Sequence, residues 1–117
     1  AADVGMNTSD GEGFGLCQLE HMYVGAPQIV VDTGTYRTLM DEKVAEFIKT
    51  GERVYFAGGM PLGFHAPAVS AEETANAIER MVDTLGDKKK SVNAYPFRSW
   101  STVCDSFLED VLTVAGK

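Results

Sequence analysis

The chain has 117 residues, and its 44% apolar content with only four prolines is typical of a folded domain rather than a disordered segment. Ten basic and 17 acidic residues give a formal net charge of −7, which disfavours nucleic acid as a partner. No apolar run approaches the roughly 20 residues of a membrane-spanning helix, and the first residues lack the basic-then-apolar order of a signal peptide, so we expect no membrane span and a cytoplasmic location.

The first 23 residues predict a strand, a turn and a helix. Residues 4–8 read as a short strand, and the glycine-rich residues 11–15 predict a turn with almost no side chains. Apolar residues then recur at the three- to four-residue spacing of a helix whose apolar face packs on a sheet: Leu16, Leu19 and Tyr23. The glycine-rich turn therefore leads directly into a helix N-terminus.

Two glutamates eight positions apart are the most informative residues: Glu12 lies in the turn, and Glu20 lies about one turn inside the helix. A ligand at this helix N-terminus would meet free backbone N–H groups, the positive end of the helix dipole and both carboxylates. Such a site suits a molecule with a phosphate and vicinal hydroxyls. Because a buried unpaired carboxylate costs several kcal/mol, we expect Glu20 to face a cleft, a ligand or a cation. Glu12 alone would also fit a purely structural role beside the dipole.

The glutamate pair belongs to a longer pattern. Residues 12–20 read EGFGLCQLE, residues 7–9 read NTS, and residues 25–27 read GAP before an apolar strand. This pattern resembles the donor-sugar half of retaining GT-B glycosyltransferases of family 4, the group 1 glycosyltransferases. The resemblance weakens after Asp32, where the family usually has two glycines followed by a glutamate and this chain has TGTYR, so no residue role is carried over from that segment.

The resemblance implies a parallel-sheet, Rossmann-like α/β fold and transfer of a sugar from a nucleotide-diphosphate sugar to an acceptor, with retention of the anomeric configuration. Glu12 would face hydroxyls of the transferred sugar at the catalytic centre, and Glu20 would bind the nucleotide ribose. Backbone amides of four residues would face the sugar and diphosphate: Gly13, Phe14, Gly15 and Leu16. The family requires no metal or other cofactor for this step, and its catalytic histidine and diphosphate-binding basic pair come from parts of the enzyme outside these 117 residues.

The middle of the chain predicts further elements of an α/β fold. Residues 28–32 form a continuous apolar run, typical of a strand buried on both faces of a parallel sheet. We expect a helix over residues 40–49, a third strand over residues 53–57 and a long loop over residues 58–67. Three strands are few for such a sheet, so the fold is expected to be incomplete in this chain.

Two helices are expected in the last third. Ser70 and Glu73 form a capping box that opens a helix ending at Gly86, and the lysines at residues 88–90 predict a solvated turn. The apolar face of this helix comprises Ala71, Ala75, Ile78, Val82 and Leu85. A final helix opens near Ser99 with an apolar stripe of Trp100, Val103, Phe107, Val111 and Leu112. The resemblance then implies that residues 1–98 are part of a nucleotide-sugar-binding domain, and that residues 99–117 form a helix that packs toward a missing N-terminal domain.

Two other functions stay open at this stage. A dinucleotide-binding dehydrogenase is suggested because Gly11 and Gly13 follow a strand and Asp32 closes the next strand, 21 residues after Gly11. However, Leu16 replaces the third glycine of that pattern. The other alternative is a non-catalytic module that binds a nucleotide or another protein. Cys17 and Cys104 are expected to be reduced core residues, because each lies within a helical apolar pattern and neither has a companion at metal-ligand spacing.

Overall fold

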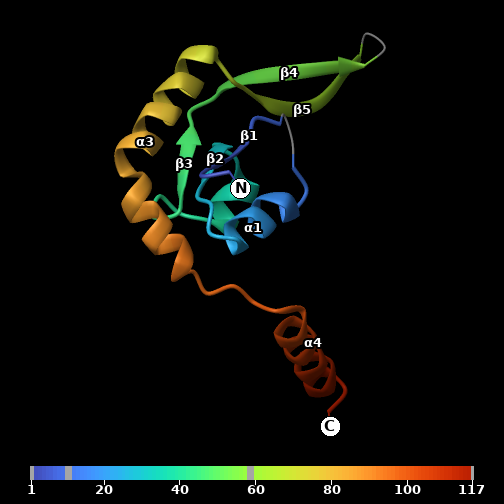
Figure 1. The fold of residues 1–117 in the computed structure, drawn as a ribbon. Coiled ribbons are helices and arrows are strands. Elements are labelled where there is room, and N and C mark those ends of the chain that lie inside the picture. Colours follow the sequence, from blue (N-terminus) through green and yellow to red (C-terminus); the bar gives the residue numbers. More distant parts are fainter. Residues whose placement is uncertain (1, 10–11, 58–59, 117) are drawn as a thin grey trace.

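A small parallel sheet forms the centre of the computed structural model, which describes residues 2–9, 12–57 and 60–116. Its strands lie in the order β1 (Gly5–Asn7), β2 (Gln28–Val31) and β3 (Ala45–Ile48) (Figure 1). Ile29 of β2 is in register with Met6 on one side and with Glu46 on the other. The expected α/β class, the parallel pairing and the strands near residues 4–8 and 28–32 are therefore confirmed.

Strand β2 is buried along its whole length, as its apolar run predicted. One face of the sheet packs against α1 (Leu16–Tyr23) and α2 (Gly34–Leu39). Residues of this cluster include Met22, Val30, Tyr36, Ala45 and Phe47. The other face packs against α3 (Ala71–Asn93) through Ile29, Ile48, Ala77 and Met81. Helices thus shield both faces of the sheet, and its apolar strands can be buried on each side.

The helix predicted over residues 40–49 is wrong. Helix α2 ends before Met40, and the following segment forms β3, which pairs in parallel with β2. Val44, Phe47 and Ile48 have the spacing of one helix face, and all three are indeed buried. Because a short buried strand also presents a continuous apolar run, periodicity alone did not distinguish the two structures.

The third expected strand exists but belongs to a different sheet. Strand β4 (Gly51–Ala57) pairs antiparallel with β5 (Met60–Ala68), and the hairpin extends away from the parallel sheet (Figure 1). The loop predicted over residues 58–67 is therefore wrong from Met60 onward, while Gly58 and Gly59 lie outside the described residues. Prolines fit β5 because each strand of a two-stranded hairpin has an open edge.

Helix α3 starts as predicted and continues further. The Ser70 hydroxyl accepts a hydrogen bond from the Glu73 amide at 3.1 Å, so the N-terminal cap is confirmed. The helix runs through Gly86 to Asn93, and residues 88–90 are helical rather than a turn. Its buried residues are Ala77, Met81, Lys88 and Val92, whereas Ile78 and Val82 of the expected apolar face are exposed.

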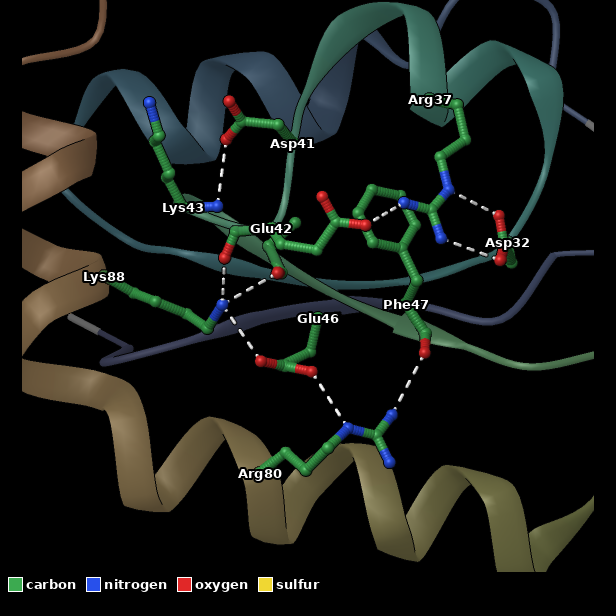
Figure 2. Close-up of polar contacts among 10 residues, drawn as sticks. Asp32, Arg37, Asp41, Glu42, Lys43, Glu46, Phe47, Arg80 and Lys88 are labelled. Carbon is green, nitrogen blue, oxygen red and sulfur yellow. Dashed lines mark hydrogen bonds and ion pairs between the residues drawn. The ribbon is translucent and has the colours of Figure 1, made fainter.

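A polar network ties α3 to β3 (Figure 2). The Lys88 ammonium group lies 2.9 Å from a Glu46 carboxylate oxygen and donates to the carbonyl of Ala45 at 2.9 Å and to that of Glu42. Arg80 pairs with the other Glu46 oxygen at 3.0 Å. The buried face of α3 therefore uses charge pairing where the sequence pattern predicted only apolar contacts.

The last helix, α4 (Trp100–Val114), begins after Ser99 as predicted. The Ser99 hydroxyl caps it by accepting from the Thr102 amide at 3.1 Å. Every residue of α4 is exposed, and the helix stands away from the rest of the chain (Figure 1). The radius of gyration is accordingly 17.5 Å, against about 13 Å for a compact domain of this length.

Candidate functional site

The predicted donor-binding residues lie together where β1 leads into α1. Residues 12–16, named here the 12–16 turn, follow the carboxyl end of β1 and end at the first residue of α1. In open parallel α/β sheets, ligands bind beyond the carboxyl ends of the strands. Phe14 is 55% exposed, and Leu16 is half exposed. The turn is therefore open to a ligand from outside.

Gly15 fixes the shape of the end of the turn. It precedes the first residue of α1 with φ 84°, in the left-handed region that favours glycine. A Cβ atom here would lie 3.1 Å from a ring carbon of Tyr36 and 3.2 Å from a methyl carbon of Leu39. Gly15 has no side chain to cap the helix, and within the described residues the first backbone N–H groups of α1 have neither an intrahelical partner nor a side-chain cap. These are the donors that an anionic ligand would use.

Glu12 is partly buried in the turn. One of its carboxylate oxygens accepts a hydrogen bond from the Phe14 amide at 3.3 Å. The Phe14 amide, one of the four predicted to face the sugar and diphosphate, is thus already engaged inside the turn. Gly11, the first glycine of the expected turn, lies outside the described residues.

Glu20 lies on the solvent-facing side of α1, four residues after Leu16 and therefore on the same face, about 6 Å further along the helix axis. No other residue in the described part of the chain bonds to its carboxylate. Glu20 is exposed rather than buried, so burial does not require a partner for its carboxylate, and its contact with a ligand stays a prediction. The apolar face predicted for this helix is wrong, since its buried residues are Gln18 and Met22.

Helix α2 lies against the turn, a contact that the sequence did not predict. The Thr35 hydroxyl donates to the Glu12 carbonyl at 3.0 Å, and the Tyr36 hydroxyl donates to the Gln18 side-chain oxygen at 3.3 Å. Burial raises the pKa of Tyr36. Between the turn and α2 lies a cavity of about 310 Å³, lined by Gly13, Phe14, Gly34, Thr35, Thr38 and Leu39.

A larger cavity of about 540 Å³ lies elsewhere, between the end of β1 and the start of α3. Its walls include Met6, Thr8, Val69, Ser70, Ala71, Thr74, Ala75 and Ile78, and none of these described residues has an acidic, basic or thiol side chain. The smaller cavity is lined by Gly13 and Phe14 of the turn, and we therefore place the candidate site there despite its lesser volume.

Asp32, the acidic residue of the dehydrogenase interpretation, is held in an ion pair. Arg37 donates to its two carboxylate oxygens at 2.7 and 2.8 Å, also pairs with Glu42, and lies 3.7 Å above the centre of the Phe47 ring (Figure 2). The hydrogen bonds from Arg37 lower the pKa of Asp32, and those to Asp32 and Glu42 raise the pKa of Arg37. Both oxygens of Asp32 are thus already used inside the protein.

The two cysteines are free and exposed, so the expectation that Cys17 and Cys104 are core residues is wrong. Within the described residues, no group of three or more His, Cys, Asp or Glu side chains is arranged to hold a metal ion. Of the helices in residues 2–9, 12–57 and 60–116, none has the length and apolar character to cross a membrane.

Comparison with known proteins returned no match, whether to protein-family models, to curated proteins or to solved structures. The function must therefore be argued from the residues of the site itself.

Proposed function

We propose that the 12–16 turn and α1 bind a nucleotide-diphosphate sugar, and that the chain is the donor-binding part of a retaining hexosyltransferase with a GT-B, Rossmann-like architecture. One observation carries the proposal. Beyond the carboxyl end of a parallel strand, the partly buried Glu12 precedes the first amides of α1, and the exposed Glu20 follows them about one turn along the same helix. This supplies donors for a diphosphate and acceptors for hydroxyls within one site.

Each group has a distinct task in the proposed chemistry. The diphosphate accepts hydrogen bonds from the first amides of α1, and the helix dipole stabilises the charge that develops on it as the sugar departs. Glu20 accepts hydrogen bonds from ribose hydroxyls, and Glu12 orients the sugar through its hydroxyls. Because positioning and charge stabilisation provide the rate enhancement, neither carboxylate has to form a covalent intermediate.

The acceptor and the remaining catalytic groups come from a separate N-terminal domain in this proposal. The exposed apolar residues of α4 support a contact of that kind, since extended apolar surfaces usually mark interfaces. The proposed protein needs no metal or cofactor for transfer, and it acts in the cytoplasm without binding nucleic acid.

The dehydrogenase alternative has less support. The acidic residue of a dinucleotide-binding site accepts from ribose hydroxyls, whereas both oxygens of Asp32 already accept a hydrogen bond from Arg37. That alternative also gives no role to the pair of Glu12 and Glu20. A module that binds the nucleotide without catalysis uses the same turn, so it differs from the proposed enzyme in activity rather than in ligand.

Calorimetric titration of this chain with a panel of nucleoside-diphosphate sugars, free nucleoside diphosphates and NAD tests the proposal. We expect one nucleotide sugar to bind, its own nucleoside diphosphate to compete with it, and NAD not to bind. Binding of NAD with no affinity for any nucleoside diphosphate would favour the dehydrogenase. Transfer assays on the protein joined to a complete N-terminal domain then separate the enzyme from the non-catalytic module.

A further inference from the structure

The 12–16 turn has few contacts of its own to fix its shape. A Cβ atom at Gly13 would touch nothing, and the Phe14 side chain is largely exposed. Inside the turn, the main polar contact is the bond from the Phe14 amide to the Glu12 carboxylate. Since glycine-rich backbone has many accessible conformations, the observed one depends on contacts from outside the turn.

Helix α2 provides those contacts at two points. The bond from the Thr35 hydroxyl to the Glu12 carbonyl joins residues 23 positions apart at the start of the turn. At the other end, the ring of Tyr36 lies directly against Gly15, and Tyr36 is only 1% exposed. Its hydroxyl reaches Gln18 on the buried side of α1. The turn is thus held on both sides of the exposed Phe14.

Another threonine in α2 shows that this contact is specific. The Thr38 hydroxyl donates to the Gly34 carbonyl at 2.8 Å, a bond inside α2 that does not reach the turn. Of the two threonines of α2, Thr35 is therefore the one whose hydroxyl bonds to the turn. Removing either hydroxyl deletes one similar hydrogen bond, but only the Thr35 bond fixes the backbone of Glu12.

We propose that Thr35 and Tyr36 are positioning residues, which fix the direction of Glu12 and of the amides of residues 13–16 and so set the affinity of the turn for its ligand. The contacts described above show how α2 holds the turn. The identity of the ligand rests on the function proposed above. In this proposal, the segment after Asp32, where the resemblance to glycosyltransferases weakens, acts by packing against the turn rather than by contact with the ligand.

The first test measures backbone order of the turn by NMR relaxation in Thr35→Val, Thr35→Ser and the control Thr38→Val. We expect order parameters for residues 13–16 to fall from about 0.85 toward about 0.6 in Thr35→Val. Thr35→Ser keeps the hydroxyl and should restore the wild-type values, and Thr38→Val should leave them unchanged. Tyr36→Phe, which keeps the ring against Gly15, should lower them less. Unchanged order in Thr35→Val, or an equal fall in Thr38→Val, would overturn the proposal.

The second test titrates the same variants with UDP-glucose as the probe. Loss of one hydrogen bond that holds the turn should weaken binding about five- to tenfold in Thr35→Val, with recovery in Thr35→Ser. If wild type and Thr35→Val bind equally, the positioning role is wrong while the proposed function stands. If wild type does not bind UDP-glucose but the order parameters fall as expected, the positioning role stands and the proposed donor fails.

Discussion

The ammonium group of Lys88 lies 2.9 Å from a carboxylate oxygen of Glu46, although the two residues are 42 positions apart and Lys88 is only 5% exposed. The same ammonium group donates to two backbone carbonyls of the segment around β3. A buried lysine is tolerated when its charge is paired and its protons are bonded. Lys88 therefore fastens the second half of α3 to β3.

Replacing Lys88 by Met keeps the length of the side chain but leaves two carbonyls and part of the Glu46 carboxylate without a donor. We expect the free energy of unfolding to fall by about 1 to 3 kcal/mol, because unsatisfied buried polar groups pay their full desolvation cost. Urea denaturation measures this loss. Lys90→Met is the matched control, since the exposed Lys90 pairs with the exposed Asp87 and removal of this surface pair should change little. Equal stability of the two variants would contradict the buried-lysine role.

Secondary structure could be predicted where local signals were unambiguous. Strand β2 was predictable because a fully buried strand is a continuous apolar run, and the start of α3 because Ser70 and Glu73 form a local cap. The segment at residues 40–49 failed because its apolar residues fit both a helix face and a buried strand. The prediction of a solvated turn at residues 88–90 failed for another reason. The partner of Lys88, Glu46, is distant in sequence, so nothing local distinguished Lys88 from a solvated lysine.

In the candidate site, too, features with a local signal were predictable and those that depend on distant contacts were not. The turn was predictable from glycines between a strand and a helix, and Gly15 indeed has the left-handed conformation that explains one of them. Its support by Thr35 and Tyr36 was not predictable, because these contacts span 23 and 18 positions and no local pattern encodes them. The exposure of Glu20 was missed because α1 buries Gln18, a polar residue, in place of the expected apolar ones.

Two glycines should respond to alanine in opposite ways. Gly15→Ala should lower the free energy of unfolding by about 1 to 2 kcal/mol, because the left-handed conformation disfavours a Cβ atom and Tyr36 and Leu39 crowd the position. Gly86→Ala should raise it by about 0.5 to 1 kcal/mol, since Gly86 lies inside α3 with open space around it. Urea denaturation of both variants checks the signs, and a stabilising Gly15→Ala would show that the turn is not fixed as described.

The ion pair of Asp32 with Arg37 predicts a defined pH dependence. Hydrogen bonds from Arg37 lower the pKa of Asp32 below 3.8, its ordinary value. A carboxyl whose folded-state pKa is depressed stabilises the fold above its unfolded pKa, and this contribution is lost as the pH falls through the folded-state pKa. We expect wild type to be more stable than Arg37→Met at neutral pH, with a difference that shrinks from about pH 5 downward.

Urea midpoints of wild type and Arg37→Met across this pH range provide the measurement. Lys43→Met is the control, because it removes one nearby positive charge whose ammonium group has no carboxylate partner in the described part of the chain. The difference in urea midpoint between wild type and Lys43→Met should not shrink as the pH falls. A constant difference between wild type and Arg37→Met down to about pH 3 would exclude a stabilising role for the pair.

Glu20→Gln should weaken the proposed nucleotide binding while leaving the fold intact. The amide keeps the shape of the side chain, but each ribose bond loses its charge assistance, so affinity should fall about tenfold or more. Because Glu20 is exposed and unpaired in the described structure, the unfolding midpoint should not change. Glu79→Gln, at an exposed position of α3, is the control for net charge. Unchanged calorimetric affinity for the nucleoside diphosphate would remove Glu20 from the site.

Glu12→Ala should weaken binding of the nucleotide sugar but not binding of the free nucleoside diphosphate. The proposed partner of Glu12 is the sugar, so affinity for the nucleotide sugar should fall about tenfold, while affinity for the free nucleoside diphosphate should stay within about twofold. Removing this carboxylate also frees the Phe14 amide, which could loosen the turn. Glu12→Gln controls for that effect, because its side-chain oxygen can still accept from Phe14 while the charge is gone. If Glu12→Ala weakens binding of the free nucleoside diphosphate as much as Glu20→Gln does, the two glutamates do not have the separate roles assigned to them.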